Sequence, residues 1–463
     1  MNAPLTPGFV NGEVSFWYRE QGIPTPAAPL PGDRQADVAI VGGGYTGLWT
    51  AYYLKKADPA LRVAVLEKEF AGFGASGRNG GWLAGLLPGS PARYAHRHGA
   101  EAAIRFQRAM FDGVDEVLRV AATEGIDADL VKGGLFNVAR TPAQAARLRA
   151  EVAEQRAWGW TPGDVDLLTT DEMNARLRVA GALAASWSPH CARVQPAKLA
   201  RGLARAVRDL GVEIYEGTPV TTIAPGRAIT PTGTVRAEIV LRCTEGFTAE
   251  VPGHHRDWLP MNSSMIVTEP LTCWDEIGWD GRELLGDMAH YYMYAQRTAD
   301  DRIAFGGRGR PYLYGSRVDD RGHTHDWTVA ALWQLLTAFF PAAAGARVDH
   351  AWSGVLGVPR DWCATVGLDR ASGLGWAGGY TGHGVAAANL AGRTLSDLAL
   401  GRDTPHTALP WVDRRVRRWE PEPLRWLGVH AMYRLYRFAD AREASGTPRT
   451  SVLARIADMI TGH

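Results

Sequence analysis

A glycine-rich turn between a strand and a helix constrains the fold of this chain more than any other feature. The apolar run from Ala36 to Val41 predicts a buried strand, and Tyr45 to Ala57 has the apolar spacing of a helix. Between them, Gly42, Gly44 and Gly47 form the pattern G-x-G-x-x-G. In such a turn the first glycine allows the tight bend, the second lets a pyrophosphate approach the backbone, and the third lets helix and strand pack closely. The helix N-terminus then offers unpaired N–H groups to the phosphates.

A second strand and an acidic residue complete a βαβ unit around this turn. The run from Leu61 to Leu66 predicts another buried strand, and Glu67 follows it, 20 residues beyond Gly47. At that place an acidic side chain binds the ribose hydroxyls of a dinucleotide. A chance match in a chain of 53 glycines would not put the strand, the helix and the acid in register. The unit predicts an adenine-dinucleotide site and leaves open whether FAD or NAD occupies it.

The rest of the chain predicts a larger, mixed fold. The first thirty residues are rich in Pro and Gly and predict an extended lead-in without a regular element. From Tyr94 to about Arg149 the spacing is helical, apart from a strand-like run at Gly133 to Arg140, which favours an inserted region. A glycine-dense segment from Gly373 to Gly384 leads into a helix predicted over Val385 to about Leu400. Further strand-like runs lie at Val212–Tyr215, Val235–Leu241, Ser264–Thr268 and Arg302–Phe305.

The segment after Pro410 alternates arginines with Trp, Leu, Met and Tyr at helical spacing. Such a stripe either covers the body of a protein or lies on a membrane surface, and the first is the commoner case. We find no secretory signal at the N-terminus and no apolar run of about 18 residues, so we expect no membrane span.

Composition narrows the function classes. A length of 463 residues favours two domains, and a formal net charge of +1 provides no field that attracts nucleic acid. The four cysteines lie far apart without a CxxC or Cys/His cluster, which argues against a metal site and a disulfide framework. We therefore expect a cytoplasmic protein with no metal. The oligomeric state stays open.

Two motifs relate the chain to a known family. Directly after Glu67 comes KEFAGFGASGRNGG, and GGYTGHG spans Gly378 to Gly384. On these motifs the chain resembles the FAD-dependent D-amino-acid oxidase, glycine oxidase and sarcosine oxidase family, especially its γ-glutamylputrescine-oxidase-like branch. In that family the first motif wraps the flavin and the second returns the chain to the isoalloxazine ring. The resemblance extends from about Asp37 to Gly401 and implies FAD.

The resemblance also implies a fold and a cofactor site. Weaker matches are CTEGFT from Cys243, similar to the turn after a later cofactor-domain strand, and the segment from Ala192 that leads to Val220, whose backbone would face adenine. The implied fold is α/β (mixed α+β), with an interrupted Rossmann-like FAD-binding domain and a substrate domain built on a mainly antiparallel sheet. The segments are 30–90, 192–250 and 352–402 for FAD, 91–191 and 251–351 for substrate, and 403–463 for a C-terminal helical tail packed on the body. The residues implied to bind FAD are Gly42, Gly44, Tyr45, Thr46, Gly47, Glu67, Lys68, Gly74, Ala75, Ser76, Arg78, Asn79, Gly80, Gly81, Val220, Thr244, Gly246, Gly379, Thr381, Gly382, His383, Gly384 and Val385.

Departures from sarcosine oxidase bear on the chemistry. The cysteine that links covalently to flavin there falls at Gly354 here, so we expect noncovalent FAD. The two basic residues that hold the substrate carboxylate fall at Ala84 and Ala386, which disfavours an N-methylglycine-type substrate. The lysine linked to oxygen activation falls at Ala304, which weakens the case for an oxidase.

Other residues are candidates for the reaction site. Arg308 falls at a position that faces the substrate in sarcosine oxidase and offers an anion site, with Arg310 close by, although each could be a surface arginine. Tyr292, Trp352 and Tyr380 are candidates to line the pocket over the flavin, although each could be a core residue.

A helix N-terminus at Gly382 to Gly384 would stabilise negative charge on a reduced flavin. His383 would add a donor or a cation there, or serve as a structural histidine.

These inferences predict an oxidoreductase of small amines or amino acids. The expected reaction oxidises the carbon–nitrogen bond to an imine, which water hydrolyses to an aldehyde or keto acid, with molecular oxygen as acceptor and hydrogen peroxide as product. Arg308 suggests a substrate with an anionic group distant from the amine. The alternatives are a flavin amine dehydrogenase that passes electrons to a quinone or electron-transfer protein, an NAD-dependent dehydrogenase, and a non-catalytic flavin-containing assembly protein.

Overall fold

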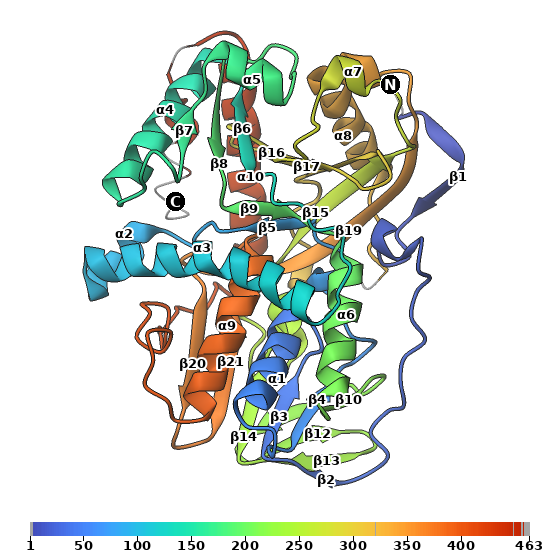
Figure 1. Cartoon of the computed structure of the whole chain (residues 1–463), viewed down its shortest axis with the longest axis vertical. Helices are drawn as coiled ribbons and strands as arrows, with labels where there is room; N and C mark the ends of the chain where they lie inside the picture. Colours follow the sequence, from blue (N-terminus) through green and yellow to red (C-terminus); the bar gives the residue numbers. More distant parts are fainter. Residues whose placement is uncertain (1–2, 320, 448, 455–456, 458–463) are drawn as a thin grey trace.

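The structure is a computed structural model that describes residues 3–319, 321–447, 449–454 and 457 (Figure 1). A six-stranded sheet lies in the lower half of Figure 1, with five parallel strands and one antiparallel strand at an edge. The strands in order are β10 (Glu213–Tyr215), β4 (Val63–Leu66), β3 (Val38–Val41), β14 (Ile239–Arg242), β21 (Leu374–Gly378) and β20 (Thr365–Asp369).

Both faces of this sheet are covered, which explains why every residue of β3 and β4 is buried. Helices α1 (Tyr45–Ala57), α6 (Pro196–Asp209) and α9 (Gly384–Ala399) share one apolar core with these strands. On the other face lies a four-stranded sheet, whose Ala228 and Val235 pack against Ala39 and Leu66. Its strands are β11 (Thr222–Ala224), β12 (Arg227–Thr230), β13 (Gly233–Arg236) and β2 (Arg34–Gln35).

A nine-stranded, mainly antiparallel sheet forms the other large part of the fold, in the upper half of Figure 1. The parallel pairs in it are β1 with β19 and β16 with β6. The strands in order are β1 (Leu5–Asn11), β19 (Val348–Pro359), β15 (Trp258–Thr268), β18 (Ile303–Gly307), β17 (Met293–Arg297), β16 (Leu284–Asp287), β6 (Leu135–Ala139), β8 (Ala184–Ser188) and β7 (Asp166–Leu167). The predicted combination of a Rossmann-like domain and an antiparallel substrate sheet is confirmed.

Helices connect and cover these sheets. The long helix α3 (Ala100–Thr123) lies across the middle of Figure 1, and α8 (Asp326–Phe339) packs its apolar face on the nine-stranded sheet. Further helices are α2 (Pro91–His98), α4 (Pro142–Ala157), α5 (Thr170–Arg176) and α7 (Trp274–Ile277). Strands β5 (Trp82–Ala84) and β9 (Cys191–Arg193) form a small two-stranded sheet.

The arginine-rich tail contains helix α10 (Leu424–Glu443), whose Val429, Tyr433 and Tyr436 are buried against the body. This is the covering role that the sequence favoured over a membrane surface. Among the residues described, no helix combines the length and the apolar character needed to cross a bilayer.

Three expectations from the sequence need correction. The lead-in was expected to lack regular structure, but β1 pairs with β19 and a short 3-10 helix, η1 (Phe16–Tyr18), follows it. The run Val235–Leu241 is not one strand, because β13 ends at Arg236 and β14 begins at Ile239 in another sheet. The predicted boundary at residue 352 falls inside β19, so its second half pairs with β15 and not with the dinucleotide-binding sheet.

Candidate functional site

A cavity of about 1080 Å³ is lined by residues from both large sheets. We call the lining from the β3–α1 turn, the end of β4, residues 74–80, residues 218–220, residues 244–247 and residues 380–385 its cofactor side. The lining from the loop 288–292, the residue after β18, and α10 is its substrate side. The two flavin-type motifs lie on the same cavity, so one extended ligand can contact all of these segments.

The backbone path of the β3–α1 turn and the start of α1 requires glycines. Gly42 has φ +110°, and a Cβ on it would lie 2.5 Å from the carbonyl oxygen of Cys243. A Cβ on Gly47 would overlap the carbonyl oxygen of Gly42. The backbone N–H of Tyr45 donates to Ser76 Oγ at 2.8 Å, which joins this turn to the segment 74–81. This backbone matches the close approach that a pyrophosphate requires.

Glu67 lies at the end of β4 and lines the cavity. Its carboxylate accepts hydrogen bonds from the N–H groups of Gly43 at 2.6 Å and Glu69 at 3.0 Å. Removal from water raises the pKa of Glu67 to about 7. Val220 lines the same part of the cavity, so the predicted ribose-binding acid and the predicted adenine contact lie on the cofactor side together.

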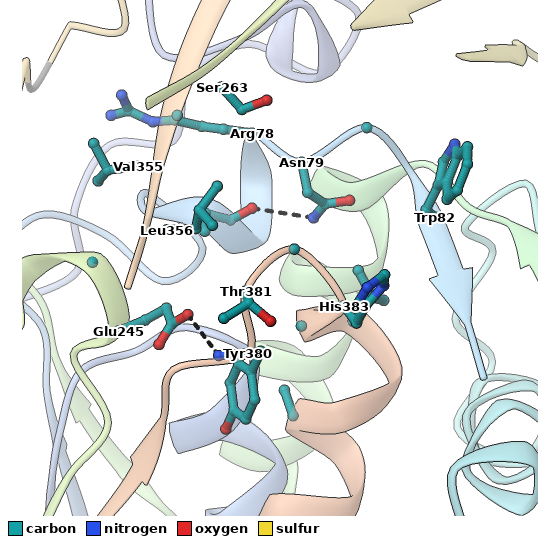
Figure 2. Close-up of a pocket in the computed structure, with 18 of the residues that line it drawn as sticks. Arg78, Asn79, Trp82, Glu245, Ser263, Val355, Leu356, Tyr380, Thr381 and His383 are labelled. Atoms are coloured by element: carbon teal, nitrogen blue, oxygen red, sulfur yellow. Dashed lines mark hydrogen bonds between the residues drawn. The ribbon is translucent and has the colours of Figure 1, made fainter. Parts of the chain in front are cut away.

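The segment 74–81 forms a tight turn that contains η2 (Ala75–Gly77). Asn79 fixes it, because its side chain accepts from Gly81 N at 2.8 Å and donates to the carbonyls of Ala75 and Ser76 at 3.1 and 3.0 Å (Figure 2). A Cβ on Gly80 would lie 2.6 Å from the ring of Tyr294. At Gly80 the backbone of the turn therefore lies directly against the nine-stranded sheet.

Residues 5–18, which we call the N-terminal arm, contain β1 and η1 and form hydrogen bonds to this turn. Ser15 Oγ donates to the carbonyl of Gly77 at 2.6 Å, and Trp17 Nε1 donates to that of Asn79 at 2.8 Å. Trp352 adds a third bond, from its Nε1 to the carbonyl of Arg78 at 2.8 Å. Trp352 was a candidate to line the pocket, but it is fully buried in a core with Trp17 and does not line the cavity.

Glu245, at the start of η3 (Glu245–Glu250), is a site residue that the sequence reasoning missed. Its carboxylate accepts from the N–H groups of Gly379 at 2.8 Å, Tyr380 at 3.3 Å and Gly357 at 3.3 Å (Figure 2). Removal from water raises the pKa of Glu245 to about 7. The acid within CTEGFT was the available clue, since a carboxylate in a strand-end turn can accept backbone N–H bonds.

Tyr380 and His383 lie on the turn that enters α9, as Figure 2 shows. The hydroxyl of Tyr380 bonds to Thr46 Oγ1 at 2.9 Å, which connects this turn to α1. His383 precedes α9 and lines the cavity. Burial lowers the pKa of His383 to about 4, so at neutral pH the side chain is uncharged. Of the two predicted roles, the donor stays possible and the cation is disfavoured.

Arg308 directly follows β18 and lines the substrate side. Its guanidinium carbon lies 4.6 Å from the ring centroid of Tyr292 and 5.1 Å from that of Tyr433. Within the described part of the chain, no carboxylate forms an ion pair with it. Arg310, in contrast, is exposed. The cavity thus contains a cation held by aromatic faces.

Further lining residues were not predicted. Ser263 and Tyr294 share a hydrogen bond of 2.6 Å between their hydroxyl groups, and Trp82 and Leu356 also line the cavity (Figure 2). Tyr436 comes from α10, a segment predicted only to cover the body. These residues lack a local sequence motif, which is why the sequence did not reveal them.

Most of the predicted cofactor and reaction-site residues line this cavity. The exceptions, besides Trp352, are glycines at which close packing is required or which lie just outside it: Gly47, Gly81 and Gly379. The positions of the missing family side chains, Ala84, Ala304 and Ala386, are buried and do not line the cavity. The glycine backbone, the acid at the end of β4 and the turn before α9 fit an FAD molecule.

Comparisons with known proteins agree with this geometry. Residues 37–398 match the family described as FAD dependent oxidoreductase. The gamma-glutamylputrescine oxidoreductase of Escherichia coli (strain K12) is 30% identical over 380 residues, which cover 79% of this chain and 84% of that protein. A probable oxidoreductase, OrdL, of Rhizobium meliloti (strain 1021) is 29% identical over 416 residues, covering 87% and 90%.

Among solved structures, the glycine oxidase from Geobacillus kaustophilus superposes with a TM-score of 0.70 at 23% identity, covering 82% of this chain and 99% of that one. At this identity the match shows the fold alone. The extent of the family match, together with the cavity and its two glycine-rich turns, shows that the chain belongs to the family of FAD-dependent oxidoreductases.

Proposed function

We propose that the protein oxidises the carbon–nitrogen bond of a small amine or amino acid that carries an anionic group away from the amine. The observation that carries this proposal is Arg308, a cation on the cavity wall between Tyr292 and Tyr433 without an acidic partner among the described residues. A buried charge is costly unless a partner compensates it, and a substrate carboxylate or phosphonate would do so. Candidate substrates are an ω-amino acid, a γ-glutamyl polyamine or an aminophosphonate.

The chain's own residues prepare the site for this reaction. Glu245 holds the turn before α9, and the Tyr380–Thr46 bond fixes that turn against α1. The N-terminus of α9 then faces the cavity, where its N–H groups stabilise negative charge. Arg308 orients the substrate by its anionic end, which leaves the amine toward the turns. When bound, FAD supplies the two-electron acceptor that no amino acid side chain provides.

We further propose that FAD is bound noncovalently. Gly354 lines the cavity at the position where sarcosine oxidase has its linking cysteine. Cys243 also lines the cavity, but burial raises its pKa to about 12, so that the thiol is a poor nucleophile at neutral pH. The four cysteines form no disulfide, which supports a reducing, cytoplasmic location.

Molecular oxygen is the acceptor that we favour, with hydrogen peroxide as product. A flavin dehydrogenase that uses a quinone or an electron-transfer protein is the second candidate. The buried Ala304, which replaces the lysine linked to oxygen activation in sarcosine oxidase, favours this alternative. The rate at which oxygen reoxidises the substrate-reduced protein distinguishes the two, because a dehydrogenase reacts slowly with oxygen.

Replacing Arg308 tests the proposed substrate class. In Arg308→Ala we expect KM for an anionic amine to rise about thirtyfold or more, because a charge-assisted hydrogen bond is lost, while kcat changes little. Steady-state kinetics with an amine panel measures this effect. Arg310→Ala is the matched control, since Arg310 is exposed and two residues away. An unchanged KM in Arg308→Ala would remove the argument for an anionic group.

A further inference from the structure

Helix α10 lies outside the part of the chain that matches the family, which ends at residue 398. Its inner face nevertheless contributes to the cavity. Tyr433 and Tyr436 are 8% and 6% exposed, and Tyr436 lines the cavity. The outer face is different, since Phe438 is 66% exposed. The helix therefore has one face that belongs to the substrate side and one that faces away from the body.

Arg308 stands between α10 and the loop 288–292. The ring of Tyr433 lies on α10, and the ring of Tyr292 lies at the end of the loop, with the guanidinium 5.1 and 4.6 Å from the two centroids. Tyr436 stacks on His290 of the same loop, with centroids 5.9 Å apart and planes inclined by 17°. The two tyrosines beside Arg308 restrict its rotamers and also pair with it by side-chain hydrogen bonds. A guanidinium has five N–H donors, so donors remain for a ligand.

Asp440 of α10 fixes the loop. Its two carboxylate oxygens accept the backbone N–H groups of His290 at 2.9 Å and Tyr291 at 2.8 Å. Tyr291 in turn donates its hydroxyl proton to the carbonyl of Gly309 at 2.9 Å, beside Arg308. One residue of α10 thus sets the backbone that carries Tyr292 and is linked to the segment that carries Arg308.

Glu443 anchors the end of the helix. Its buried carboxylate accepts from Arg147 Nη2 at 2.8 Å and lies 3.0 Å from His290 Nε2. His290, Asp440 and Glu443 place candidate metal-ligand atoms within 4.8 Å of one another. The bonds from Arg147 to Glu443 and from two backbone N–H groups to Asp440 already use these acids, so the cluster functions as an anchor and not as a cation site.

We propose that α10 is the specificity-determining wall of the substrate pocket. Tyr433 holds the Arg308 guanidinium in the orientation that receives a carboxylate through two parallel N–H bonds, and Asp440 is the positioning residue for the opposite ring, Tyr292. This inference rests on the proposed function, since it presumes that Arg308 binds the anionic end of the substrate. It goes further in assigning selection of the carboxylate to a helix beyond the family region.

The test compares a carboxylate with its neutral amide on the FAD-loaded protein. Pentanoate and pentanamide have no amine to oxidise, and their Kd values follow from the perturbation of the flavin absorption spectrum. We expect the parent protein to prefer pentanoate at least tenfold. Tyr433→Leu and Asp440→Asn should each lower this preference about fivefold to tenfold, whereas Tyr433→Phe should retain it. Phe438→Ala, on the outer face of α10, is the matched control.

A second readout separates positioning from a general structural effect. With an anionic amine of the panel, anaerobic flavin reduction should show a higher apparent Kd in Tyr433→Leu and a limiting rate within about twofold of the parent value. Flavin content and Tm verify folding, and Asp440→Asn, which retains one acceptor oxygen, carries the test if Tyr433→Leu does not fold.

The outcomes are distinguishable. If Arg308→Ala abolishes the preference for pentanoate but Tyr433→Leu and Asp440→Asn retain it, α10 does not determine specificity and the proposed function stands. If the parent protein shows no preference, or Arg308→Ala leaves it intact, the inference falls together with the anionic part of the proposed function. Bleaching of the flavin by an amine would then still support amine oxidation.

Discussion

The two sides of the cavity differ in how much of their surface is backbone and how much is side chain. Much of the cofactor side is backbone, and at Gly42 and Gly80 there is no room for a Cβ. The substrate side consists of long side chains from separate elements, such as Tyr292 and Arg308. A backbone surface has one shape whatever the neighbouring side chains are, whereas a side-chain surface changes with each substitution. This difference allows one cofactor site to serve many substrate pockets.

The acids on the two sides also differ in how they are held. On the cofactor side, removal from water raises the pKa of Glu67 and of Glu245 to about 7, and backbone N–H groups are their partners. In the α10 anchor next to the substrate side, hydrogen bonds from His290 and Arg147, acting against desolvation, lower the pKa of Glu443 to about 2. The cofactor side therefore holds acids through backbone dipoles, and the α10 anchor holds its acid through side-chain partners.

The largest expected effect comes from adding one carbon to the cofactor side. In Gly47→Ala the new Cβ would overlap the carbonyl of Gly42, so we expect the purified protein to retain less than about a tenth of the FAD of the parent protein. Flavin absorbance per protein measures this loss. Gly345→Ala is the control, because no atom lies within 4 Å of a Cβ at that position. Normal FAD content in Gly47→Ala would contradict the rigid-backbone description.

The pH dependence of stability should have opposite sign for the two kinds of acid. The pKa of Glu245 is raised in the folded protein. Its contribution to the free energy of unfolding is therefore complete below about pH 4.5 and is lost as the pH rises through 7. That of Glu443, whose pKa is lowered, is full above about pH 4.5 and is lost as the pH falls toward 2.

We therefore expect the Tm difference between the parent protein and Glu443→Gln to shrink between pH 5 and pH 3. The Tm difference between the parent protein and Glu245→Gln should instead shrink as the pH rises from 5 to 8. Thermal unfolding across this range, with FAD bound, measures both. If both differences change in the same pH window, the contrast between the two sides is wrong.

The smallest effect is expected at the edge of the cofactor side. Lys68 lines the cavity and pairs with Glu250 at 3.4 Å, and both side chains are about 40% exposed. Exposed ion pairs contribute about 0.2–1 kcal/mol, so Lys68→Ala should weaken FAD binding less than about fivefold. Titration of the FAD-free protein with FAD, followed by flavin fluorescence, gives the Kd. A loss above tenfold would show that Lys68 contacts the cofactor directly.

The same contrast explains what the sequence could predict. The turns at Gly42–Gly47 and at residues 74–81 are local motifs, so their glycines could be recognised one by one. Glu245 was missed because its partners lie more than 100 residues away in the chain. Tyr433 and Tyr436 were interpreted as a covering stripe, since helical spacing gives the buried face but not what it is buried against. The prediction for Trp352 was wrong for the same reason. The sequence pattern of a residue buried in a core is the same as that of a residue buried at a pocket.

The N-terminal arm has a consequence for how the protein is made. Leu5 pairs with Val348, and Trp17 supports the turn at Asn79. Leu5 therefore meets its partner strand only after Val348, 343 residues later in the chain, has been synthesised. Until then the flavin-binding turn has no completed support, although its own sequence is already present. Cofactor binding should consequently follow the synthesis of β19.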